Sequence, residues 1–122
     1  MRYLLILLLV SGCSTWRKED TVRESVALAF IAVDYGQTKT IARNPQQYHE
    51  TNPILGEHPS VGQVNAYYIA TAVLHPTLAA LLPTDHCIGP ICDWRAAFQW
   101  VTIAVEAGYV AHNYSIGIKT DF

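Results

Sequence analysis

Three segments with helix start and stop signals constrain the fold most strongly. Capping boxes, in which a Thr or Ser hydroxyl and an acidic or amide side chain three residues later bond backbone N–H groups reciprocally, open helices at Thr21–Glu24 and Ser60–Gln63. Asp93 is a typical N-cap for a third helix. Pro45 and Pro83 follow the ends of the first two. We predict an all-α, antiparallel three-helix bundle. Its helices span residues 21–43, 60–82 and 93–117.

The first residues have the pattern of an export signal. Arg2 is followed by an apolar run over residues 3–10, which is shorter than the roughly 20 residues that cross a bilayer as a helix. We interpret residues 1–12 as a signal peptide. Val10-Ser11-Gly12-Cys13 resembles the bacterial lipobox. The resemblance implies cleavage before Cys13, acylation of its thiol by palmitate-type chains, and a single lipid-anchored domain over residues 13–122.

The expected location follows from this anchor. Several acyl chains hold a protein at a membrane almost permanently. The residue after Cys13 is Ser14, which favours the outer membrane of a Gram-negative envelope under the sorting rule of enteric lipoproteins. Insertion of the helices themselves would instead place the protein in the inner membrane.

The two other cysteines lie close together in the segment DHCIGPICDW. In an oxidising compartment, Cys87 and Cys92 are expected to form a disulfide. A metal pair that uses His86 is the alternative, but this spacing is a weak metal signal.

Composition and motifs argue against several functions. A net charge of −2 gives no basic surface for nucleic acid. His49-Glu50 begins like a zinc-protease motif, but position 53 holds proline and the second histidine is missing. The chain has no phosphate-binding glycine loop and no nucleophile elbow. We therefore expect no enzyme activity, no metal, no cofactor and no nucleic-acid partner.

A polar seam follows one face of the third predicted helix. Its members Arg95, Gln99, Thr102, Glu106 and Asn113 recur at helical spacing, with Tyr109 on the same face, whereas the other faces are mostly apolar. The first helix adds Asp34, Gln37 and Thr38, and the second adds Asn65 and His75.

The seam has two interpretations. A polar stripe within an apolar surround suits helices inserted in lipid with the stripe facing inward. A soluble bundle with the stripe facing water is the alternative. By counting residues from the helix ends, Asp34 and Glu106 lie at one depth. Together with His75 they would form a proton or ion site, because two close buried carboxylates cannot both ionise cheaply. Alternatively, each serves packing through hydrogen bonds.

The motifs Asp34–Thr38, Glu50–Gly56, His58–Ser60 and Glu106–Tyr109, with Asn113, form a wider pattern. This pattern is similar to a group of small uncharacterised lipoproteins and membrane proteins of bacteria and their phages. The resemblance covers most of the mature chain and implies no established activity. The phage members suggest a role at the envelope of an infected cell, such as superinfection exclusion.

These observations lead to two functional hypotheses. The first is an envelope lipoprotein that binds another, unknown envelope protein. Its contact surface would be the proline-rich loop over residues 44–59, with Tyr48, Glu50, Asn52 and Pro53 as contact residues. The second is a small intramembrane proton or ion site built from Asp34, Glu106 and His75.

Overall fold

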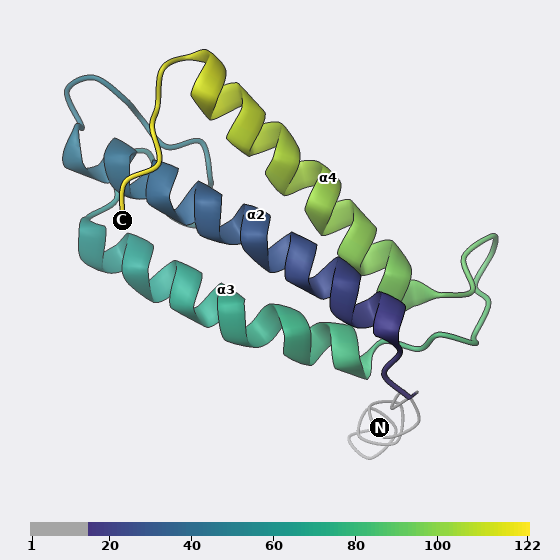
Figure 1. The fold of residues 1–122 in the computed structure, drawn as a ribbon. Coiled ribbons are helices and arrows are strands. Elements are labelled where there is room, and N and C mark those ends of the chain that lie inside the picture. The colour runs from purple at the N-terminus through teal and green to yellow at the C-terminus, as the bar shows by residue number, and fades with distance from the viewer. Residues whose placement is uncertain (1–14) are drawn as a thin grey trace.

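Three helices form the structure, a computed structural model that describes residues 15–122. They are α2 (Lys18–Arg43), α3 (Val61–Leu81) and α4 (Trp94–Ser115), and the described residues form no strand. Figure 1 shows α2 between the other two helices, with α3 antiparallel to it. α2 packs against both, whereas α3 and α4 contact each other much less. The predicted all-α three-helix bundle is confirmed.

The export signal and the lipidation site are not part of this description. Residues 1–12 and Cys13 lie outside the residues that the structure describes. Both therefore stay predictions from the sequence.

The caps of α3 and α4 are formed as the sequence pattern indicates. The Ser60 hydroxyl accepts a hydrogen bond from the Gln63 backbone N–H at 3.2 Å, and the Gln63 side chain accepts one from the Ser60 N–H at 2.8 Å. The Asp93 carboxylate accepts a hydrogen bond from the Ala96 N–H at 2.8 Å. Each cap satisfies N–H groups that have no partner within the helix.

The predicted start of the first helix is wrong by one turn. α2 begins at Lys18, and the Asp20 carboxylate accepts a hydrogen bond from the Arg17 backbone N–H at 2.9 Å. Thr21 is not an N-cap, because its hydroxyl accepts a hydrogen bond from the Trp16 indole N–H at 2.8 Å. Glu24, the other half of the expected capping box, points instead into the bundle.

The bundle has polar side chains inside and many apolar side chains outside. Fully or almost fully buried polar side chains are Asp20, Glu24, Gln37, Thr38, His75, Arg95 and Gln99. Exposed apolar side chains on α3 and α4 are Ile69, Val73, Leu74, Leu78, Trp100, Val101 and Val105. Apolar packing is confined to small groups such as Ile31, Val64 and Tyr68. The polar seam therefore faces the interior, and the interpretation in which it faces water is wrong.

Within residues 15–122, no helix is long and apolar enough to cross a membrane.

The C-terminal tail packs back onto α2. Ile118 is buried, and the Asp121 backbone N–H donates to the carbonyl oxygen of Gly36 at 3.2 Å. The Thr40 hydroxyl donates to the Lys119 carbonyl oxygen at 2.7 Å. A glycine in the middle of α2 allows this approach, because a Cβ at position 36 would lie 2.5 Å from the Thr120 methyl carbon.

Gly36→Ala is expected to displace the tail, because the new methyl group would lie 2.5 Å from the Thr120 methyl carbon and 3.3 Å from the Asp121 backbone nitrogen. We expect a loss of about 1 kcal/mol in the free energy of unfolding and faster hydrogen exchange at the Asp121 amide. The matched control is Gly108→Ala on α4, where a new Cβ meets nothing within 4 Å. That control should be stabilising by about 0.5–1 kcal/mol. Unchanged exchange at Asp121 in Gly36→Ala would show that the tail is not held in this way.

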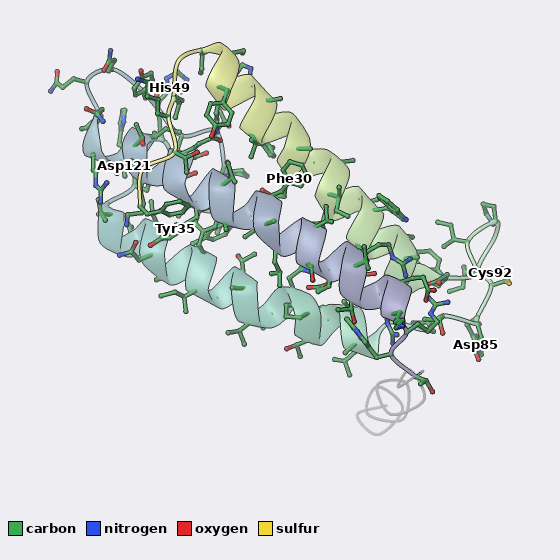
Figure 2. All side chains as sticks on the ribbon, viewed as in Figure 1. Phe30, Tyr35, His49, Asp85, Cys92 and Asp121 are labelled. Carbon is green, nitrogen blue, oxygen red and sulfur yellow. A yellow bond between two sulfur atoms is a disulfide. The ribbon has the colours of Figure 1, made fainter. Side chains whose placement is uncertain are left out.

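The loop between α3 and α4 contains a disulfide. Cys87 and Cys92 are joined, and the backbone N–H of Ile88 donates to the carbonyl oxygen of Ile91 at 2.9 Å. Figure 2 shows Cys92 and Asp85 at the end of the bundle opposite to His49 and Asp121. The disulfide is therefore remote from the loop over residues 44–59.

Candidate functional site: an acidic pocket under the 44–59 loop

The polar interior begins with a buried ion pair. The fully buried Arg95 donates to Asp20 at 2.9 Å and to the carbonyl oxygens of Ala79 and Ala80, at 2.8 and 3.1 Å. Burial alone would raise the pKa of Asp20, but hydrogen bonds from Arg17 and Arg95 hold it well below its usual range. Arg95 thus joins the start of α2 to the end of α3.

A second buried cluster lies one turn further along α2. Glu24 contacts the His75 imidazole Nδ1 at 2.7 Å and accepts a hydrogen bond from the Gln99 amide at 2.9 Å. The other imidazole nitrogen lies 2.9 Å from the Thr102 hydroxyl. The His75 ring also stacks on Phe98 with centroids 4.5 Å apart. Each polar group has a partner, so this cluster serves helix packing.

The third cluster surrounds Asp34. The Tyr68 hydroxyl donates to one carboxylate oxygen, and the Asn113 amide approaches the other at 3.4 Å. The same amide donates to Gln37 at 3.1 Å, and the Tyr68 hydroxyl lies 3.0 Å from that of Thr38. This cluster joins all three helices.

The remaining seam residue, Asn65, lies beside the third cluster. Its side-chain oxygen accepts a hydrogen bond from the Tyr35 hydroxyl at 2.7 Å. It therefore contributes to the contact between α2 and α3.

A pocket of about 580 Å³ opens beside the third cluster. Its walls come from α2, α3, α4 and the 44–59 loop. The helices contribute Asp34, Thr71, Glu106 and Asn113. The four loop residues predicted as a contact surface all line it as well: Tyr48, Glu50, Asn52 and Pro53. The 44–59 loop and the polar seam were predicted as separate features, and both line this one pocket.

Two carboxyl groups of the pocket, those of Asp34 and Glu106, have raised pKa values. Burial raises the pKa of Glu106 to about 7, and the charge of Asp34 adds to the effect. Burial likewise raises the pKa of Asp34 to about 6, with the hydrogen bond from Tyr68 acting against the shift and the charge of Glu50 adding to it. Near neutral pH the pocket is therefore poised to gain or lose a proton.

The loop holds Glu50 at the pocket by local hydrogen bonds. One carboxylate oxygen of Glu50 accepts from the backbone N–H groups of Thr51 and Asn52 at 2.8 and 2.9 Å. The Glu50 N–H donates to the Glu57 carbonyl oxygen at 2.8 Å, which closes the loop on itself. Asn52 accepts from the Ile54 N–H at 2.9 Å. Glu50 and Asn52 therefore shape the loop as well as line the pocket.

His75 does not belong to this pocket. The sequence grouped it with Asp34 and Glu106, but its ring bonds Glu24 and Thr102 and does not line the cavity. Two interior residues were missed: Asp20 and Glu24. Helical spacing places Tyr68 on the same face as Asn65 and His75. Glu24 had been assigned to a capping box, and Asp20 lay outside the predicted first helix.

The residues that the structure describes include no group of three or more His, Cys, Asp or Glu side chains that could hold a metal ion. No protein-family model, curated protein or solved structure matches the chain. Its function therefore has to be argued from the pocket itself.

Proposed function

We propose that the chain is a lipid-anchored envelope protein that binds another envelope component through its 44–59 loop and the pocket beneath it. The observation that carries this proposal is the convergence of Tyr48, Glu50, Asn52 and Pro53 on the cavity beside Asp34 and Glu106. Recognition sites are typically concave, with mixed aromatic and apolar walls and a few placed polar groups. Ordered loops on a rigid scaffold commonly carry such sites.

The exposed apolar side chains of α3 and α4 support contact of the bundle with a partner protein or a lipid layer. Ile69 and Val73 on α3 are 66% and 62% exposed, and Val101 on α4 is 61% exposed. Large exposed apolar areas usually mark contact with another protein or a membrane. A lipid at Cys13 would keep these faces close to a bilayer.

Fractionation of cells that express the full chain tests the anchor. We expect the protein in the membrane fraction and the Cys13→Ala variant in the soluble fraction, because the lipid supplies the attachment. Ser14→Ala is the matched control, since it changes the neighbouring residue and keeps the thiol. Retention of Cys13→Ala after alkaline carbonate extraction would contradict anchoring by lipid alone.

A second candidate function is proton exchange at the Asp34 and Glu106 pair. The observation that favours it is that burial raises both pKa values, with the charge of Asp34 adding to the shift of Glu106 and the charge of Glu50 adding to that of Asp34. His75 takes no part in this version of the hypothesis. Asp34→Asn and Glu106→Gln should both abolish proton traffic into vesicles that contain the purified protein. If traffic is absent in the unmodified protein, this candidate fails and the binding function is unaffected.

A further inference from the structure

The pocket combines acidic groups and aromatic rings without a balancing cation. Three carboxylates line it, from Asp34, Glu50 and Glu106, and so do four tyrosines: Tyr48, Tyr67, Tyr68 and Tyr109. Among the described residues, none that lines the cavity is lysine or arginine. Carboxylates that are partly removed from water and lack a cationic partner favour a cationic ligand.

Two of the carboxylates also have a buried oxygen that receives no hydrogen bond from the described residues. One oxygen of Glu50 and one of Glu106 are buried and without a partner among the residues 15–122. The other Glu50 oxygen is occupied by loop N–H groups, and Asp34 has Tyr68 and Asn113. A buried acceptor without a donor is costly, so the pocket favours a cation that carries N–H groups.

We propose that the pocket binds a primary alkylammonium group, carried by a free amine or by a lysine side chain of a partner. The inference rests on the proposed binding function and names the chemistry of the ligand. An ammonium group offers three N–H donors to the carboxylates. Tyrosine faces attract a cation and cover an apolar stem. The volume of about 580 Å³ falls in the usual range for small-ligand sites.

The charged and titratable groups around the pocket come from every element that packs there. α2 contributes Asp34, and α3 contributes Tyr67 and Tyr68. Glu106, Tyr109 and His112 come from α4, and Tyr48, His49 and Glu50 come from the loop. As the pH rises through about 6 and about 7, Asp34 and Glu106 ionise and binding should strengthen.

Calorimetric titration of the purified full chain in detergent tests the proposal. The probes are 1,5-diaminopentane, the N-acetylated tripeptide Gly-Lys-Gly, whose only ammonium group is the lysine side chain, and tetramethylammonium, which has the charge but no N–H donor. We expect binding of at least one amine probe at about pH 8.5, at least about tenfold weaker binding at about pH 5, and at least about tenfold weaker binding of tetramethylammonium. Tighter binding of the diamine identifies a free amine, and tighter binding of the tripeptide identifies a lysine side chain.

Matched substitutions locate the site. Glu106→Gln should weaken amine binding by at least about tenfold, because it removes a charge inside the pocket. Glu57→Gln makes the same change on an exposed loop residue outside the pocket lining and should alter binding by less than about twofold. Thermal unfolding of both variants establishes that they are folded.

Three results would overturn the proposal. They are no binding of either amine probe, equal binding of tetramethylammonium, and equal losses in Glu106→Gln and Glu57→Gln. Envelope attachment and partner contact through the loop are measured separately, so failure of amine binding would leave the proposed function standing. If partner contact is lost and amine binding is retained, the proposed function fails and the amine site stands.

Discussion

Arg95→Met is expected to destabilise the protein by about 3–5 kcal/mol, the largest effect of any single substitution considered. The change removes the hydrogen bond from Arg95 to the buried Asp20 carboxylate. It also removes the donor that satisfies the carbonyl oxygens of Ala79 and Ala80. A typical domain has only about 5–15 kcal/mol of stability, so much of the margin would be lost. Urea unfolding followed by far-UV circular dichroism measures the difference.

The control for this prediction is another arginine in an ion pair. Arg43 bonds Asp121 at 2.7 Å, but the two side chains are 39% and 64% exposed. Arg43→Met should therefore cost less than about 1 kcal/mol. Similar losses in both variants would show that Arg95 is not buried against Asp20 and the end of α3.

Glu106→Gln is expected to stabilise the protein by about 2 kcal/mol at about pH 8 and to have almost no effect at about pH 4. Burial raises the pKa of Glu106 to about 7 from a usual value of 4.5. Between these values the folded state holds more protons than the unfolded state, so stability falls as pH rises. Glutamine resembles the protonated acid and removes this cost at high pH.

Chemical denaturation across the pH range measures this effect, with Glu57→Gln as the control. The exposed Glu57 should show no such pH-dependent gain. Destabilisation of Glu106→Gln at high pH would mean that the Glu106 carboxylate has a cationic or hydrogen-bonding partner within the protein. The pocket would then not be an unbalanced acidic site.

The helices could be predicted where their signals are local. Ser60 and Asp93 bond N–H groups within three residues, so the starts of α3 and α4 are readable from the sequence. The start of α2 was not, because its N-cap is Arg17, a residue type that rarely caps helices. The bond from Arg95 on α4 that helps to bury Asp20 spans most of the chain and gives no local pattern. The C-terminal tail could not be placed either, since its site depends on the absence of a side chain at Gly36.

Individual residues of the candidate site could be predicted from the sequence, but their arrangement around one pocket could not. Helical spacing identified Glu106 and Asn113 as one face, and counting from helix ends brought Asp34 near them. The same counting put His75 in a shallower layer with Gln99, and both contact Glu24 in the structure. Grouping His75 with Asp34 and Glu106 went against that count and was wrong. The return of the 44–59 loop over the pocket depends on backbone bonds such as that from Glu50 to Glu57, which sequence spacing does not show.

Site-specific photocross-linking in living cells tests the central claim most directly. A photoreactive residue at Ile54, which is 77% exposed and lines the pocket, should give a discrete adduct with an envelope component. The matched control is Ile88, which is 66% exposed in the disulfide loop at the opposite end of the bundle, and it should give none. Glu50→Gln should reduce the Ile54 adduct. An adduct at Ile88 with none at Ile54 would contradict binding through the loop and its pocket.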